Sequence, residues 1–190
     1  TEHIKASRKI VSVRIKENDI SHYLEQELYK ESKYKEIIHP GVVTAVACSD
    51  IGGVSIYIEC TSFKGTGKYT FTGSLGNMAK ESIEIAISYI KSNAKRFDID
   101  EDFFTNNDIH INFTETSINK DGPSAGVSVV TAILSHIKGV IISDKISLTG
   151  EITLNGDILK VGGLKEKTIA CERQKIEKLF IPKDNLNDIE

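Results

Sequence analysis

Residues 121–126 read Asp-Gly-Pro-Ser-Ala-Gly, and they open a largely apolar segment that continues through residues 127–137. Proline suits the first turn of a helix because its ring fixes φ and its missing N–H would have no partner there. Gly139 follows the segment, and glycine favours the end of a helix. The sequence therefore predicts a buried helix over 124–138, with the hydroxyl of Ser124 in its first turn.

The Ser124 hydroxyl is a candidate nucleophile because of where this helix begins. Backbone N–H groups in the first turn have no partner within the helix, and with the positive helix end they can stabilise a developing oxyanion. Asp121 and Gly122 fit the cap region, and the small residues around the serine would let a substrate backbone approach. A serine that only caps or packs at a helix start explains the hexapeptide equally well, so both interpretations stay open.

The composition is that of a globular protein without a membrane anchor. The chain has 190 residues, of which 39% are hydrophobic and 27% charged, and no apolar run approaches the ~18 residues that span a bilayer. The net charge is −3 and charges of both signs are interspersed, which argues against a nucleic-acid partner. One domain is expected, and a chain that begins at Thr1 rather than Met is interpreted as a piece of something longer.

The cysteines and histidines indicate neither a disulfide framework nor a metal site. Cys48, Cys60 and Cys171 are far apart and show no Cys-x-x-Cys spacing. No two of the five histidines have helical metal-ligand spacing. We therefore expect no bound metal and a reducing compartment.

Hydrophobic alternation predicts the sheet. Residues 41–49 and 54–60 form the clearest antiparallel pair, joined by a turn at 50–53, and the alternation in 54–60 is typical of a sheet with one wet face. Further strands are predicted at 69–72, 108–113, 146–154, 157–161 and 179–181, with a two-residue Asn-Gly turn at 155–156. Further helices are predicted at 22–35, 78–90 and 164–175. Strands and helices interleave without a regular βαβ repeat, which favours the α+β class.

A serine nucleophile needs a base, and two kinds of side chain could supply it. His110 remains possible, whereas His136 lies 12 residues further along the same helix, roughly 18 Å from Ser124, and is too far away. The other solution is a lysine kept neutral by burial and a positive neighbour, for which Lys165 and Lys167 are candidates. The helical angles of the apolar neighbours mildly favour Lys165, and a solvent-facing position is the ordinary one for either lysine.

Two shorter motifs point to other classes of protein and fit poorly. Residues 65–68 read Gly-Thr-Gly-Lys, but Ser62 stands where a phosphate loop would have its first glycine, and Tyr69 follows the lysine. The Gly-x-Ser-x-Gly pattern at 122–126 suggests the elbow of α/β-hydrolases, a strained turn that proline before serine does not suit. We expect a flexible loop at 65–68.

Five blocks of sequence resemble the proteolytic domain of the Lon proteases, in order and spacing, from about residue 10 to residue 182. The blocks are 41–44 with 52–53, 73–82, 120–126, 149–154 and 162–167. The similarity is greatest to the A-type Lon, in which this domain is the C-terminal part. The resemblance implies the α+β fold called ribosomal protein S5 domain 2-like, with mixed sheets and packed helices. It also implies a proteolytic domain over 10–190, with residues 1–9 leading in from an ATPase module.

The resemblance assigns a Ser-Lys dyad. It implies that Ser124 is the nucleophile and that Lys167, the second lysine of the Gly-Gly-Leu-Lys-Glu-Lys block, is its general base, against the weak angular preference for Lys165. It also implies that Thr149 hydrogen-bonds the lysine and that Asp121 helps to set the conformation of the nucleophile loop. The other supporting residues are Gly122 and Pro123, beside the implied oxyanion-hole N–H groups, and Glu151.

The activity implied is that of a serine endopeptidase, ATP-dependent in the full-length protein, that cleaves unfolded or damaged proteins through an acyl-enzyme. No cofactor is expected in this domain, because ATP and Mg belong to the ATPase module. Full-length members form a homohexameric ring, in the bacterial cytoplasm or, alternatively, the mitochondrial matrix. We expect substrate to lie extended beside the strand at 41–49, and no contact with nucleic acid or membrane.

The chain departs from the family pattern at four positions. Asn119 replaces a proline before the nucleophile, and Asn112 replaces the second histidine of a His-x-His pair. Cys48 and Ala45 replace a tryptophan and a glycine in the first hairpin. None removes the dyad, and all bear on the substrate pocket, the loop or the histidine pair.

Two other functions suit a fold of this kind. One is a small-molecule kinase that holds phosphates with a glycine- and serine-rich loop at a helix start. The other is a non-catalytic interaction domain in which the serine is a relict. The block that contains Lys167 favours the protease, because a phosphate loop has no need of that second segment.

Overall fold

The computed structural model describes residues 14–16, 19–23, 37–49 and 52–188. The chain divides into two compact units, Thr1–Glu31 and Ser32–Glu190. In the first unit the described residues include one short helix, α2 (Ile20–Tyr23).

Two predictions fall largely outside the described residues. The lead-in segment over 1–9 and the boundary at residue 10 lie wholly outside them. Of the predicted helix over 22–35, only the first two residues are described. These predictions therefore stay predictions.

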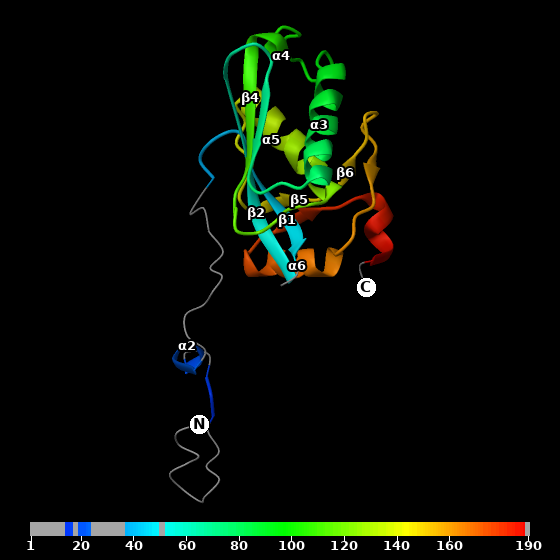
Figure 1. The fold of residues 1–190 in the computed structure, drawn as a ribbon. Helices are drawn as coiled ribbons and strands as arrows, with labels where there is room; N and C mark the ends of the chain where they lie inside the picture. The colour runs from blue at the N-terminus through cyan, green and yellow to red at the C-terminus, as the bar shows by residue number, and fades with distance from the viewer. Residues whose placement is uncertain (1–13, 17–18, 24–36, 50–51, 189–190) are drawn as a thin grey trace, which may run out of the picture. The chain divides into compact units, whose positions relative to one another are not determined.

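The second unit is built on a six-stranded mixed sheet with the strand order β3-β4-β2-β1-β5-β8, of which β1, β2, β4 and β5 are labelled in Figure 1. The strands are β1 (Val42–Ser49), β2 (Gly52–Lys64), β3 (Tyr69–Thr72), β4 (Asn107–Phe113), β5 (Ile146–Leu148) and β8 (Lys178–Phe180). β2 pairs antiparallel with β1 and β4, whereas β3 with β4, β1 with β5 and β5 with β8 pair in parallel. Together with the packed helices, this sheet confirms the predicted α+β class.

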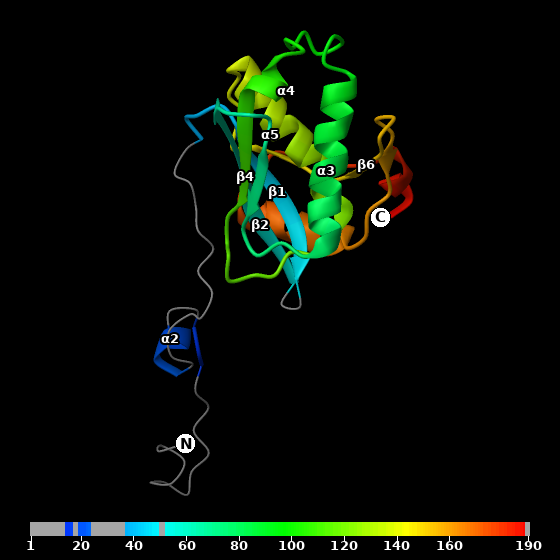
Figure 2. The ribbon, with the colours of Figure 1, turned by 45° about the horizontal axis from the view of Figure 1, so that its top comes forward.

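Helices cover both faces of the β1-β2 hairpin. α3 (Asn77–Ser92) and α5 (Gly126–Lys138) pack together on one face, and α6 (Leu164–Arg173) lies on the other (Figure 2). The remaining helical turns are α4 (Phe103–Asn106), η2 (Pro123–Ala125) and η3 (Lys183–Asp188). Among the described helices, none is both long and apolar enough to cross a membrane.

The hairpin matches its predicted position but not its predicted wet face. Val54, Ile56 and Ile58 face the main core, as their alternation indicates. The intervening Ser55 and Tyr57 are also buried, with 3% and 6% of their surface exposed. The prediction of one wet face is wrong because α6 packs on that side, which local alternation cannot reveal.

The strand predicted over 146–154 is divided in two. β5 ends at Leu148, and after Thr149 and Gly150 the chain forms β6 (Glu151–Ile152), which pairs antiparallel with β7 (Ile158–Leu159) in a separate sheet. The connection is longer than the predicted two-residue Asn-Gly turn, because the last strand pair joins Ile152 to Ile158. The break between β5 and β6 places Thr149 and Gly150 beside the start of α5.

Candidate active site

The Ser124 loop is a short 3-10 turn, η2, and α5 begins two residues after the serine at Gly126. The predicted start of the α-helix at Ser124 is therefore wrong, while its end before the left-handed Gly139 agrees with the prediction. The carbonyl oxygen of Ser124 accepts the N–H of Gly150 at 2.8 Å and the hydroxyl of Thr149 at 3.2 Å. Because these donors lie outside the helix, the serine carbonyl does not join the hydrogen-bond pattern of α5.

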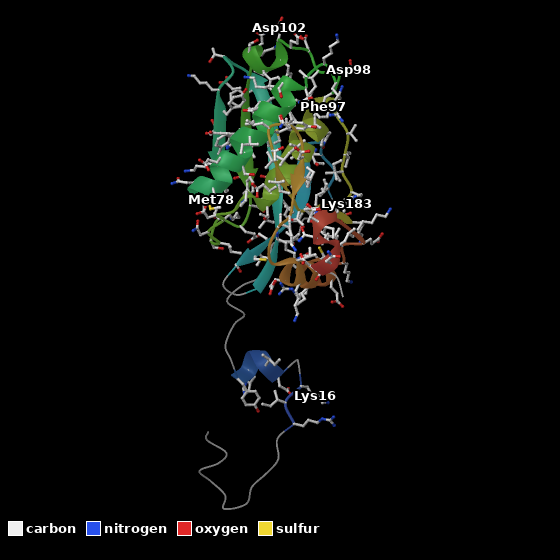
Figure 3. The ribbon with its side chains drawn as sticks, turned by 90° about the vertical axis from the view of Figure 1, so that its right-hand side faces the viewer. Lys16, Met78, Phe97, Asp98, Asp102 and Lys183 are labelled. Atoms are coloured by element: carbon white, nitrogen blue, oxygen red, sulfur yellow. The ribbon has the colours of Figure 1, made fainter. Side chains whose placement is uncertain are left out.

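Asp121 binds a helix other than the one it precedes. Its Oδ1 accepts the backbone N–H of Met78 at 3.0 Å, in the first turn of α3. Met78 is labelled in Figure 3 at that end of α3. Gly76 must be glycine there, because a Cβ would collide with the Asp121 carboxyl group. The expected cap of the nucleophile helix is thus a cap of α3, and it fixes where the Ser124 loop starts.

Lys167 lies on the buried side of α6, near the start of the helix. The buried stripe of this helix consists of Leu164, Lys167, Ala170 and Cys171, and the lysine is only 2% exposed, whereas Lys165 is exposed. The angular preference for Lys165 was wrong. It relied on Ile169, which is 47% exposed, and on Ile176, which lies beyond the helix.

One threonine joins the lysine to the serine loop. Lys167 Nζ donates to Thr149 Oγ1 at 3.0 Å, and the Thr149 hydroxyl in turn donates to the carbonyl oxygen of Ser124. Thr149 is 2% exposed, so this chain of contacts is shielded from water. Within the described part of the chain, no hydrogen bond joins Lys167 Nζ directly to the Ser124 hydroxyl.

Burial favours the neutral form of the lysine. Removal from water lowers the pKa of Lys167 below its ordinary value, and the nearby Cys48 opposes this shift only through its thiolate form. Burial in turn raises the pKa of Cys48, so that its thiol stays protonated and neutral. A lower pKa leaves more of the amine in the neutral form, which is the form that a general base needs.

Ser124 and Lys167 line the same cavity, which has a volume of about 270 Å³. Asp121, Gly122 and Pro123 also line it, so five of the predicted site residues meet there. The other lining residues are Val46, Ala47, Cys48, Ile56, Ala79, Phe113, Ile118, Asn119, Lys120, Ala125, Gly162 and Gly163.

Thr149 and Glu151 lie outside this lining. Thr149 stands behind the Lys167 amine, as its hydrogen bond shows. Glu151 is half-buried and pairs through its backbone with Leu159 in the small β6-β7 sheet. Within the described residues no side-chain hydrogen bond connects Glu151 with Ser124 or Lys167, and its supporting role stays a prediction.

The histidines stand apart from the serine. His110 Nε2 lies 3.0 Å from Thr72 Oγ1 on β3, and His136 Nε2 lies 2.8 Å from Ser62 Oγ on β2. Neither ring lines the cavity that contains the serine. Asn112 accepts a hydrogen bond from the same Thr72 hydroxyl. The two positions that form a His-x-His pair in the family pattern are therefore part of a polar cluster on the sheet.

The loop at 65–68 is closed by a carboxylate of the protein itself. Asp108 Oδ1 accepts the N–H of Thr66 at 2.7 Å and that of Lys68 at 2.9 Å, and these hydrogen bonds lower the pKa of Asp108. A carboxylate therefore takes the place that a phosphate would need. Among the described residues, no group of three or more His, Cys, Asp or Glu could hold a metal ion.

Lys120 and Ser82 are site residues that the sequence did not single out. Lys120 lines the cavity and is 7% exposed, and Ser82 Oγ on α3 donates to the carbonyl oxygen of Pro123 at 3.0 Å. The only signal for Lys120 was its place beside Asp121 in the block at 120–126. The only signal for Ser82 was its place at the end of the matched block at 73–82, because a serine inside an amphipathic helix has no distinguishing pattern.

Comparison with known proteins agrees with this geometry. The family model of the Lon protease (S16) C-terminal proteolytic domain matches residues 14–190. The Lon protease of Desulfosudis oleivorans is 42% identical over 97% of this chain and 23% of its own length. Those of Lachnoclostridium phytofermentans and Clostridium beijerinckii are 39% and 41% identical, over 100% and 97% of this chain.

The matched segment is a defined part of those proteins. The chain spans 23% and 24% of the length of the Lachnoclostridium and Clostridium relatives, about a quarter of each. The match to the family model covers the whole second unit and all the residues that line the cavity. The chain therefore belongs to the Lon protease family, and it corresponds to the C-terminal proteolytic domain of that family.

Proposed function

We propose that this chain hydrolyses peptide bonds with Ser124 as the nucleophile and Lys167 as the general base. The observation that carries the proposal is the state of the Lys167 amine. It is 2% exposed, its pKa is lowered by burial, and it lines one cavity together with the serine. A lysine in these surroundings is suited to remove a proton from a hydroxyl group.

The chemistry follows from the donors and acceptors present. A neutral amine has two N–H bonds and one lone pair, so an N–H donated to Thr149 Oγ1 leaves the lone pair for the Ser124 hydroxyl. As Ser124 Oγ bonds to the substrate carbonyl carbon, its proton passes to Lys167 Nζ. The ammonium then gives that proton to the leaving amine as the C–N bond breaks, and water hydrolyses the acyl-enzyme by the same route.

The tetrahedral intermediate needs donors for its oxyanion. Gly122 and Ser124, on either side of the N–H-lacking Pro123, carry backbone N–H groups at the start of η2 and line the cavity, which supports their assignment to the oxyanion hole. Among the described residues no hydrogen bond joins the Ser124 hydroxyl to the Lys167 amine, so the two groups must come together before attack.

An extended substrate fits beside β1. In the described residues β1 pairs with β5 through Thr44 and Ala45, and the strand continues beyond this pairing to Ser49. Val46, Ala47 and Cys48 on this continuation line the cavity. A substrate backbone could pair with this part of β1 and place its scissile carbonyl at Ser124.

The wider role of the protein is proposed from its relatives. They are bacterial proteins named Lon protease, which supports an ATP-dependent protease that degrades unfolded or damaged proteins in the bacterial cytoplasm, or alternatively the mitochondrial matrix. We place ATP and Mg in a separate ATPase module and the active sites in a homohexameric ring. We expect the proteolytic domain itself to need no cofactor and to contact no nucleic acid.

Cleavage of casein by the full-length protein tests the dyad. We expect Ser124→Ala and Lys167→Met each to lower kcat by about a thousandfold or more, because each removes one partner of the proton transfer. Lys165→Met is the matched control, since it removes an exposed lysine two residues away and should leave kcat unchanged. Normal turnover by either dyad variant would exclude the mechanism.

The pH profile supplies a second test. Lys167 must be neutral to act, so activity should rise with pH as this amine loses its proton, at a pH below the ordinary lysine pKa of 10.5. A flat profile from about pH 6 to pH 9 would argue against a lysine base.

A further inference from the structure

The ammonium group of Lys120 is enclosed by backbone carbonyls. Lys120 Nζ donates to the carbonyl oxygens of Gly73 at 3.0 Å, Glu115 at 2.5 Å and Ile118 at 2.8 Å. The side chain is 7% exposed. Only the protonated amine has three N–H donors, so all three bonds require the charged form.

Two of the three carbonyls that Lys120 Nζ binds, those of Gly73 and Glu115, belong to residues with a positive φ. Glu115 has a φ of 59° and Ser74, next to Gly73, a φ of 56°, although neither is glycine. Gly73 itself has a φ of 114°, and a Cβ there would collide with the carbonyl oxygen of Phe113. Such conformations persist only where their surroundings enforce them, and they gather at functional sites.

The same lysine is bonded on both sides through its backbone. Its N–H donates to the carbonyl oxygen of Ser74 at 3.0 Å, and its own carbonyl oxygen accepts the N–H of Gly76 at 2.8 Å. Asp121 follows and caps α3 through Met78. The Ser124 loop therefore starts from a unit whose parts meet at Lys120.

We propose that Lys120 is a positioning residue for the nucleophile: its ammonium joins the turns at 73–76 and 115–118 into one support from which the Ser124 loop extends. The lysine does not touch the reacting atoms in this role. It sets the place where the loop begins, because Asp121 follows it directly and the chain then enters η2, which contains Ser124. This inference rests on the proposed dyad.

The proposal gives the two lysines opposite protonation requirements. Lys167 must lose its proton to act, whereas Lys120 must keep its proton to hold three carbonyls. Burial lowers the pKa of Lys120, and the Glu115 carboxylate opposes this. Asp121 is the charged neighbour in the chain, the turn at 73–76 has no titratable side chain, and Lys167 and Cys48 line the same cavity as Lys120. Activity should therefore fall again at alkaline pH, as Lys120 is deprotonated.

The test compares Lys120→Met with Lys120→Arg in the full-length protein, with a fluorogenic peptide, from about pH 6 to pH 10.5. Methionine keeps the length without the charge, and arginine stays charged throughout. We expect kcat of Lys120→Met to fall by about tenfold to a hundredfold, with KM within about twofold and without the alkaline fall. Lys120→Arg should recover part of kcat and move the alkaline fall to higher pH.

Three results would overturn the proposal. The first is a Lys120→Met variant with the kcat and pH profile of the wild type. The second is an equal kcat in the two variants. The third is a Lys120→Arg variant whose activity falls at the same alkaline pH as that of the wild type. If Lys120→Met does not fold, the wild-type and Lys120→Arg profiles decide alone. Lys165→Met controls for the loss of one positive charge.

The outcomes also separate this inference from the proposed function. A wild type that cleaves, with an inactive Ser124→Ala variant and unaffected Lys120 variants, refutes only the positioning role. Cleavage by Ser124→Ala would refute the dyad itself.

Discussion

Lys120 and Lys167 are both almost fully buried, with exposed fractions of 7% and 2%, but their amines have different partners. Lys120 meets three backbone carbonyls, and Lys167 meets one threonine hydroxyl. Burial lowers the pKa of each. Three carbonyl dipoles compensate a charge, whereas one hydroxyl suits a neutral amine. This difference fits the proposed roles, in which Lys120 supports the serine loop and Lys167 reacts.

The largest expected contrast is in stability. Lys120→Met leaves three buried carbonyls without their donor, and we expect it to lower the free energy of unfolding by about 2–4 kcal/mol. Lys167→Met replaces an amine with one partner by an apolar chain of similar length, and we expect a change within about 1 kcal/mol. Urea unfolding of the chain at neutral pH measures both. Equal losses would show that the two environments do not differ as described.

The hydroxyl beside Lys167 should matter next. Thr149→Val removes the acceptor of the amine and one donor to the Ser124 carbonyl, and we expect kcat to fall by about tenfold to a hundredfold. Thr149→Ser keeps the hydroxyl and should stay within a few-fold of the wild type. Steady-state peptide cleavage measures both. If the serine variant is as slow as the valine variant, packing of the methyl group accounts for the effect.

Stability should depend on pH through Lys167. Its pKa is lower in the folded chain than the ordinary 10.5, so the unfolded chain binds more protons between these values. The contribution of Lys167 is therefore complete above pH 10.5 and is lost as pH falls through the folded pKa. Each unit of lowering corresponds to about 1.4 kcal/mol. The difference between wild type and Lys167→Met in thermal unfolding should change with pH over this window, and a constant difference would contradict it.

The smallest effect concerns the start of α6. Gly163 has a φ of 66°, its carbonyl oxygen accepts both Cys48 Sγ and the N–H of Lys167, and a Cβ there would collide with the Cys48 sulfur. We expect Gly163→Ala to cost about 1–2 kcal/mol, partly from the left-handed backbone and partly from the collision. In a Cys48→Ala background only the backbone part should remain. If urea unfolding shows the same loss from Gly163→Ala with and without the Cys48 side chain, the sulfur does not prevent a larger residue at position 163.

The sequence pattern predicted the fold well where the structure of an element depends on its own residues alone. The β1-β2 hairpin follows from alternation at 54–60, and the end of α5 from Gly139. The errors arise where distant segments meet. Helix α6 packs against β2, in which Ser55 and Tyr57 are buried, and the bonds from Thr149 and Gly150 shift the start of α5 to Gly126.

The site shows the same division. The matched blocks singled out Ser124 and Lys167, and both line the cavity. Helical angles alone chose Lys165, because Ile169 is apolar yet exposed. Lys120 could not be recognised, since its three acceptors are backbone carbonyls that any residue carries.

The contacts of Thr149 and Gly150 also indicate where extra residues can be inserted into the chain without disturbing the site. Gly150 exchanges two backbone hydrogen bonds with the serine segment, at Ser124 and Val127, while Thr149 contacts the lysine. These few hydrogen bonds therefore set the distance between Ser124 and Lys167. Residues 139–141, which follow Lys138, are exposed and take no part in these bonds. A foreign peptide inserted there would leave the spacing intact, which makes this turn a suitable place to attach a reporter to the protease.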